Sequence, residues 1–177
     1  MLKQVIVAVV GGKRSGKTTT IETLTRELSG KGYRIAAVKH VPEPNFTIDT
    51  ERKDTWRYAQ AGAKTIVCVS AAEIATIEKN ESRNPSFKEI LQKGRGCNVI
   101  FIEGLKKMVA RNKNVQKIVV VKSAEEAIKA KEDYVPILAF AGSYSIEKLN
   151  LKIPYVDAFR KPRELAELVE ELIKKTN

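Results

Sequence analysis

The feature that most constrains this chain is a glycine-rich segment that fits the phosphate-loop pattern G-x-x-x-x-G-K-[ST], namely Gly11-Gly12-Lys13-Arg14-Ser15-Gly16-Lys17-Thr18. The pattern gains specificity from what flanks it. Residues 5–10 are an uninterrupted apolar run rich in β-branched residues, which is typical of a buried parallel strand. Residues 19–28 carry apolar side chains at helical spacing. Strand, loop and helix in this order predict a phosphate-binding site.

The chemistry of such a loop assigns roles to two of its side chains. Its glycines allow backbone N–H groups to point at phosphate oxygens, and the start of the following helix adds partial positive charge. We expect Lys17 to reach the β- and γ-phosphates of a nucleotide and the Thr18 hydroxyl to bind Mg²⁺. The alternative is an ordinary glycine-rich turn with an exposed lysine, which the agreement of pattern and context disfavours.

Strand-like and helix-like segments alternate along nearly the whole chain. Strands are predicted at residues 33–39, 64–70, 73–77, 98–102, 115–121 and 135–141. Helices are predicted at residues 51–62, from an Asn84 cap to Lys93, after the Ser123 capping box, and from Pro162 onward. Several strands are apolar on both faces, which predicts an α/β fold with helices on both sides of a mostly parallel sheet. The length fits a single domain over residues 1–177.

Composition narrows the choice of partners. The net charge of +11 favours anionic partners such as nucleotides. Nucleic acid is disfavoured as a main partner, because acidic residues are interspersed and no RNA-binding signature is present. The apolar runs are too short to span a membrane, and the first strand begins close to Met1, so we expect no signal peptide and a cytoplasmic protein.

The chain has two cysteines and one histidine. Cys68 and Cys97 each lie at or within an apolar run, so we expect buried, reduced thiols. So few ligands, so far apart, argue against a structural zinc site.

Polar side chains that follow predicted strands are the other candidate site residues, because ligands bind at the carboxyl ends of parallel strands. Glu103 ends a strongly apolar strand and is expected to contact Mg²⁺ or position water. Lys39 and His40 end an earlier strand, where Lys39 could contact a phosphate and His40 could act as a base or contact a partner. Asp49 follows a proline-rich loop and is favoured for the metal over Asp54, which could instead complement a helix dipole.

Taken together, these motifs resemble the MobB family, the molybdopterin-guanine dinucleotide biosynthesis adaptor proteins. The resemblance rests on GGKRSGKTT, VKH, an Asp in the following loop, RKDTWRYAQAGA and VIFIEGLK, in that order and spacing. It extends over about residues 3 to 108. The series after the loop is much more specific than the phosphate loop, which many families share.

The resemblance implies a dimeric GTP-binding protein of the P-loop NTPase class with weak, Mg²⁺-dependent GTPase activity. It also implies a role beside the guanylyltransferase that joins GMP to molybdopterin. Carried over by position, Lys17, Asp49 and Glu103 serve hydrolysis, and Thr18, Asp49 and Glu103 surround Mg²⁺. The implied nucleotide contacts are Gly12, Lys13, Arg14, Ser15, Gly16, Lys17, Thr18, Thr19, Lys39 and His40.

Three positions depart from the family pattern: Arg52 stands where glycine is usual, Thr55 where serine is usual, and Leu105 where an aromatic residue is usual. No N-K-x-D element that would read guanine is present, so GTP specificity rests on the resemblance. Arg14, Arg52 and Arg57 are candidates for a catalytic arginine, but no motif fixes any of them there.

Two other functions stay open. One is an ATP-dependent small-molecule kinase or synthetase, which the lack of an arginine-rich lid disfavours. The other is a nucleotide-switched module that binds RNA or an acidic protein through the basic segment from Lys106 to Lys113.

Overall fold

The computed structural model describes residues 4–79, 85–143 and 152–176. Their contacts divide the chain into a core unit, Met1–His40 with Ile90–Asn177, and a second unit, Val41–Glu89. The boundary falls within one helix. The prediction of a single domain over residues 1–177 stays a prediction, but the second unit is compact in itself.

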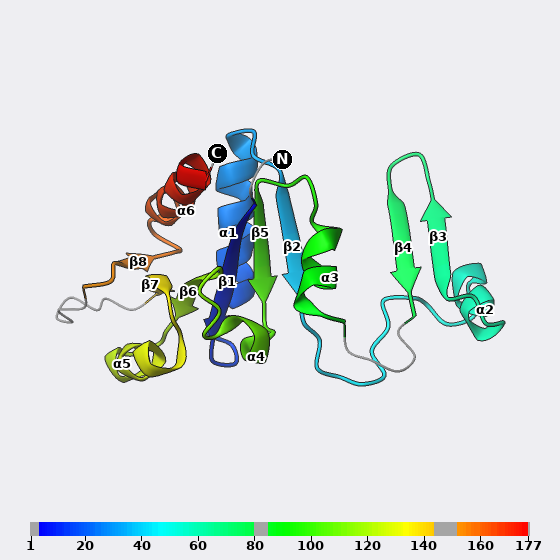
Figure 1. Ribbon diagram of the computed structural model, residues 1–177, viewed down its shortest axis with the longest axis horizontal. Coiled ribbons are helices and arrows are strands. Elements are labelled where there is room, and N and C mark those ends of the chain that lie inside the picture. The colour runs from blue at the N-terminus through cyan, green and yellow to red at the C-terminus, as the bar shows by residue number, and fades with distance from the viewer. Residues whose placement is uncertain (1–3, 80–84, 144–151, 177) are drawn as a thin grey trace. The chain divides into compact units, whose positions relative to one another are not determined.

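The core unit contains a six-stranded sheet in which every neighbouring pair is parallel, in the order β2-β5-β1-β6-β7-β8 (Figure 1). The strands are β1 (Val5–Gly11), β2 (Ile35–Lys39), β5 (Val99–Glu103), β6 (Gln116–Val120), β7 (Ile137–Gly142) and β8 (Tyr155–Asp157). β1 lies between β5 and β6, and its central residues are fully buried, as the continuous apolar run predicts.

Helices cover both faces of this sheet, which confirms the predicted fold class. On one face, α1 (Lys17–Gly30) and α6 (Pro162–Thr176) pack on Val7, Val9 and Phe101 through the buried side chains of Leu24 and Leu165. On the other face lie α4 (Lys106–Val109) and α5 (Ala124–Asp133), beside β6. The end of α1 and α6 are tied together at Glu170, which accepts hydrogen bonds from Lys31 and Tyr33. The pKa of Glu170 is lowered to about 2 by Lys174 first, and then by Lys31 and Tyr33.

The second unit is built from α2 (Asp54–Gln60) and a two-stranded antiparallel hairpin, β3 (Thr65–Val69) and β4 (Ile74–Glu78). Ile66 is its only buried apolar residue among those described, while Val67, Val69 and Ile74 are exposed. α3 (Phe87–Lys93) then leads back to the core unit.

Several predicted boundaries differ from the structure. α3 begins at Phe87 because Ser86 caps it: the Glu89 backbone N–H donates to Ser86 Oγ, and the Ser86 N–H donates to the Glu89 carboxylate. The helix was predicted to start earlier, after an Asn84 cap, but Pro85 is not helical, and Asn84 lies outside the described residues. Within the predicted basic loop, α4 forms as a single helical turn. β8 was not predicted at all.

The prediction of two buried thiols is wrong for Cys68, which is exposed, and Cys97 is half-buried. The reason is that β3, whose sequence is that of an apolar core strand, pairs only with β4. Within their own unit, most side chains of β3 are therefore left exposed. Both cysteines are free, as expected. Within the described residues, no helix has the length and apolar character needed to cross a membrane.

A buried lysine fixes the connection between α4 and β6. Lys117 is fully buried, and its ammonium group donates to the carbonyls of Asn112, Val115 and Val135 at 2.6 to 2.8 Å. Burial lowers the pKa of Lys117 to about 8, so the side chain stays protonated at neutral pH. Three carbonyls from two separate loops therefore depend on one ammonium group.

Replacing Lys117 with methionine is expected to lower the free energy of unfolding by about 3 kcal/mol, because it leaves buried carbonyls without a donor. Chemical denaturation at pH 7 measures the change. The exposed Lys113→Met variant is the control and should unfold like the unmodified protein. Equal stability of the Lys117 and Lys113 variants would show that water replaces the ammonium group without cost.

Candidate nucleotide-binding site

The phosphate loop connects the end of β1 to the start of α1, as predicted. Gly11 has φ +149°, and a Cβ there would lie 2.2 Å from the Val120 carbonyl oxygen, so only glycine fits. Gly16 has φ +101° and precedes the first helical residue, Lys17. Arg14 also takes a left-handed backbone conformation, with φ 56°. The positive φ angles of Gly11, Arg14 and Gly16 bend the backbone into a loop whose N–H groups can converge on an anion.

Two lysines brace the loop through its carbonyl oxygens. Lys17 Nζ donates to the Gly12 carbonyl at 2.6 Å, and Lys122 Nζ donates to the Lys13 carbonyl at 2.9 Å. Ser15 Oγ is buried and has no hydrogen-bond partner among the described residues. An orphaned hydroxyl in this position is a donor available to a ligand.

Glu103 is the acidic centre of the site. It is only 8% exposed at the end of β5, and the parallel register pairs it with Val9 of β1 and with Lys39 of β2. Thr18 Oγ1 donates to Glu103 Oε2 at 3.0 Å, and Lys39 forms an ion pair with Glu103 Oε1. The structure therefore brings Thr18, Lys39 and Glu103 together, as the strand-end argument predicted.

The electrostatics of the loop favour an anion. Burial lowers the pKa of Lys17, the nearby Lys39 and Lys122 lower it further, and Glu103 acts in the opposite direction. The ammonium groups of Lys39 and Lys122 and the Glu103 carboxylate are thus all close enough to act on Lys17. A bound phosphate would relieve the mutual repulsion of the lysines and restore the pKa of Lys17 toward its ordinary value.

His40 follows Lys39, as expected, and is exposed. Its backbone N–H donates to the Glu103 carbonyl at 2.9 Å. A Cβ on Gly104 would lie 2.8 Å from His40 Cβ, so the absence of a side chain at Gly104 makes room for the histidine. His40 is therefore positioned by the end of β5, at the same edge of the sheet as the loop.

Asp49 belongs to the second unit, and its place in a metal shell stays a prediction. Asp49 Oδ1 accepts hydrogen bonds from Thr55 Oγ1 at 2.8 Å and from the Thr50 N–H, while Oδ2 is buried and has no hydrogen-bond partner among the described residues. Arg52 has φ 67°, which explains why glycine suits this position in the family pattern. Asp54 is exposed and pairs with Arg57 at 3.5 Å, as an acid at a helix start does.

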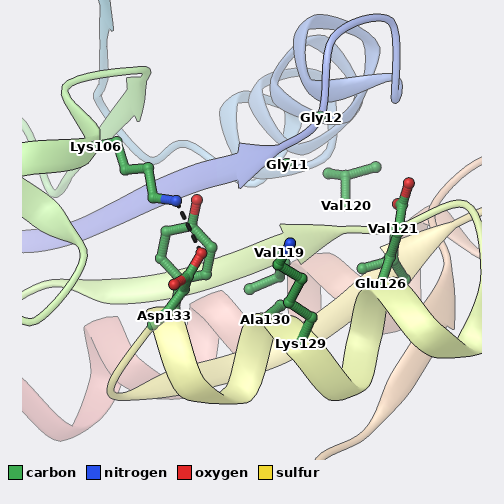
Figure 2. A pocket seen from close by; sticks show the side chains of 11 residues that line it. Gly11, Gly12, Lys106, Val119, Val120, Val121, Glu126, Lys129, Ala130 and Asp133 are labelled. Carbon is green, nitrogen blue, oxygen red and sulfur yellow. Dashed lines mark hydrogen bonds and ion pairs between the residues drawn. The ribbon is translucent and has the colours of Figure 1, made fainter.

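Two hollows adjoin the loop on the core unit. One, of about 660 Å³, lies between α1 and β2 and is lined by Thr18, Ile21, Glu22, Thr25, Arg26, Ala37, Val38, Lys39 and Glu103. The other, of about 340 Å³, lies between β6 and α5, where the Lys106 ammonium group points at the Asp133 carboxylate (Figure 2). Gly11 and Gly12 border this second hollow. The loop is thus accessible beside strand ends on both sides of β1.

Sequence reasoning missed one residue that its own rule would have found. Lys122 comes two residues after the end of β6 and directly follows the strand predicted at residues 115–121, just as Glu103 directly follows the strand predicted at residues 98–102. The rule of polar residues at strand ends applies equally there. Phe159, whose ring lies against Gly16, gives no comparable local signal.

Comparison with known proteins places the chain in a family. Residues 6–143 match the family model described as molybdopterin guanine dinucleotide synthesis protein B. The chain is 30% identical over 156 residues to a Methanocaldococcus jannaschii protein that carries the provisional name of a molybdopterin-guanine dinucleotide biosynthesis adapter protein; this covers 86% of the chain and 62% of the relative. It is 36% identical over 62 residues to the corresponding Haemophilus influenzae adapter protein, covering 35% of the chain and 34% of the relative. The chain thus spans less than two thirds of these relatives.

Solved structures agree. Bacillus subtilis MobB superposes with a TM-score of 0.73 at 26% identity, covering 94% of this chain and 96% of that one. A crystal structure of molybdopterin-guanine biosynthesis protein B superposes with a TM-score of 0.67 at 25% identity, covering 96% and 99%. With the phosphate loop, the strand-end glutamate and the parallel sheet all in place, the chain belongs to the MobB family of molybdopterin guanine dinucleotide synthesis proteins.

Proposed function

We propose that this protein is a GTP-binding adapter in the synthesis of molybdopterin guanine dinucleotide. The observation that carries the nucleotide site is the convergence of the phosphate loop with the Thr18–Glu103 pair at one edge of the sheet. The family description and the names of the relatives support a role in this pathway. In this role, bound GTP would set the conformation that a guanylyltransferase or another cofactor-pathway protein recognises.

The residues at the site fit Mg²⁺. Mg²⁺ keeps several waters and takes one or two protein oxygens together with substrate phosphates. The Thr18 hydroxyl and the Glu103 carboxylate lie 3.0 Å apart and offer two such oxygens. The described residues contain no group of three or more His, Cys, Asp and Glu side chains that could hold a metal, so phosphates and water would complete the shell. Asp49 is proposed as a further ligand on the basis of the family resemblance.

Charge pairing suggests how the site responds to nucleotide. Lys39 and Thr18 both contact Glu103. A metal on Glu103 would compete with Lys39 for the carboxylate, which frees the ammonium group for a γ-phosphate. His40, the next residue along the chain, would move with Lys39 and would carry this change to a bound partner protein.

We propose that hydrolysis is slow. Much of the rate of phosphoryl transfer comes from an arginine held against the transition state. Arg14 lies within the loop but is exposed, and Arg57 is paired with Asp54 in the second unit. The role proposed here is therefore that of a nucleotide-dependent binding protein.

The proposed functional form is a homodimer in the cytoplasm. An isolated two-stranded hairpin is at best marginally stable in water. The β3–β4 hairpin exposes Val67, Val69 and Ile74 at 56%, 69% and 70%. A second copy of the chain would cover these side chains, which supports the dimer implied by the family resemblance.

Calorimetric titration with GTP and with ATP, each with and without Mg²⁺, tests the proposed function. GTP is expected to bind more tightly than ATP, and Mg²⁺ to strengthen binding. Lys17→Ala should weaken GTP binding about 100-fold, because it removes a charge-assisted contact to phosphate. The exposed Lys107→Ala variant is the control. A preference for ATP would instead favour the kinase or synthetase function.

Glu103→Gln is expected to reduce the Mg²⁺-dependent gain in GTP affinity about tenfold, since it removes a metal oxygen ligand. Affinity measured in EDTA should change much less. Glu22→Gln, which alters an exposed glutamate lining the neighbouring hollow, is the matched control. An unchanged Mg²⁺ response would remove Glu103 from the metal site.

Val69 and Ile74 are paired across the hairpin. The substitutions Val69→Lys and Ile74→Lys are expected to convert the dimer to a monomer, because they place charge in an apolar interface. Light scattering at several protein concentrations measures the mass. Ile128→Lys, at an exposed position on α5, should remain dimeric. A monomeric unmodified protein would contradict the proposal at the outset.

A further inference from the structure

The side of the phosphate loop opposite Glu103 carries an aromatic ring. Phe159 follows β8 and is 45% exposed. A Cβ built on Gly16 would lie 3.0 Å from Phe159 Cζ and 3.7 Å from Cε2. The edge of the ring is therefore turned toward the backbone of the loop, directly before Lys17, and much of the ring remains open to solvent.

A rigid turn holds the ring in this place. Asp157 Oδ1 accepts hydrogen bonds from the Phe159 and Arg160 backbone N–H groups at 3.0 and 2.9 Å. The Lys161 N–H donates to the Asp157 carbonyl at 2.8 Å. These bonds fix the backbone on either side of the ring, so the exposure of Phe159 is set by the turn and not by an unstructured tail.

The sheet order tells which end of a nucleotide would meet this ring. β5 lies on one side of β1 and carries Glu103. The Glu103 carboxylate would bind the metal, and the metal would in turn bind the β- and γ-phosphates. β6, β7 and β8 lie on the other side of β1. With its metal-bound end at Thr18 and Glu103, a nucleotide would extend its sugar and base toward the ends of β6 to β8. Phe159 stands there, in contact with the loop.

We infer that Phe159 is the stacking platform for the base of the bound nucleotide, an inference that rests on the proposed function of the phosphate loop. Aromatic stacking is strong and tolerant of base identity, because every base has a π face. Both carboxylate oxygens of Asp157 are engaged within the turn: Oδ1 accepts two backbone hydrogen bonds, and Arg160 approaches Oδ2 at 3.8 Å. Asp157 is therefore not assigned to reading the base. In this inference the turn supplies affinity for a nucleobase, and other residues supply the preference for guanine.

The test compares ligands with and without a base. Phe159→Ala is expected to weaken GTP and ATP about tenfold each, leaving their ratio unchanged, because stacking does not discriminate between purines. Binding of Mg²⁺-tripolyphosphate, which has no base, should change less than twofold. Phe159→Tyr should keep the affinity of the unmodified protein. Ile128→Ala, another exposed apolar position in the core unit, is the control.

A spectroscopic readout separates stacking from support of the loop. In a Trp56→Phe background, which removes the only tryptophan, Phe159→Trp places a single fluorophore at the platform. GTP should quench its emission, and tripolyphosphate should not.

Equal loss of GTP and tripolyphosphate affinity in Phe159→Ala would overturn the inference, since the ring would then only support the loop. Unchanged affinity for both would also overturn it. If the unmodified protein binds tripolyphosphate but no nucleotide, the stacking role of Phe159 is rejected while the phosphate-binding role of the loop is kept. If it binds neither, the proposed function falls as well.

Discussion

The parallel pairing of β1 with β5 and β6 is the constraint on which the rest of the site depends. β1 is buried on both faces, so its position is fixed by the core and not by the loop that follows it. Its register with β5 sets Val9 opposite Glu103, and its register with β6 sets Gly11 opposite Val120. Because parallel strands end at the same edge of the sheet, apolar packing alone delivers the glutamate and the loop to one place.

Charge balance at that edge then links the parts. Lys17 and Lys122 each satisfy a carbonyl of the loop, while Lys39 pairs with Glu103. The same lysines that close the loop on itself would be drawn to an entering phosphate, which offers them stronger, charge-assisted hydrogen bonds. Binding would therefore exchange internal contacts for ligand contacts, and in this way the nucleotide state would be transmitted to the strand ends.

The parts of the site that could be predicted from the sequence are those encoded within a few residues. The phosphate loop has a local pattern, and Glu103 stands out because a charge follows a run of apolar residues. Lys39 obeys the same logic. Their convergence followed from one inference, that the sheet is parallel, which the apolar runs supported. Asp49 depends on a loop and on a second unit, for which no such rule exists, and its role stays a prediction.

The features that escaped prediction depend on contacts between distant segments. Phe159 lies in a short stretch of mixed polar and apolar residues without a distinctive pattern, and only the fold of a three-residue strand more than 130 positions after Gly16 brings its ring to the loop. Cys68 was misjudged for the opposite reason: its local pattern is that of a core strand, yet within its unit only one other strand pairs with it. An apolar strand pattern predicts that the side chains will be buried, but it does not identify the segment that buries them. In β1 the cover is the rest of the same unit, whereas in the hairpin the uncovered apolar side chains are themselves the argument for a second copy of the chain.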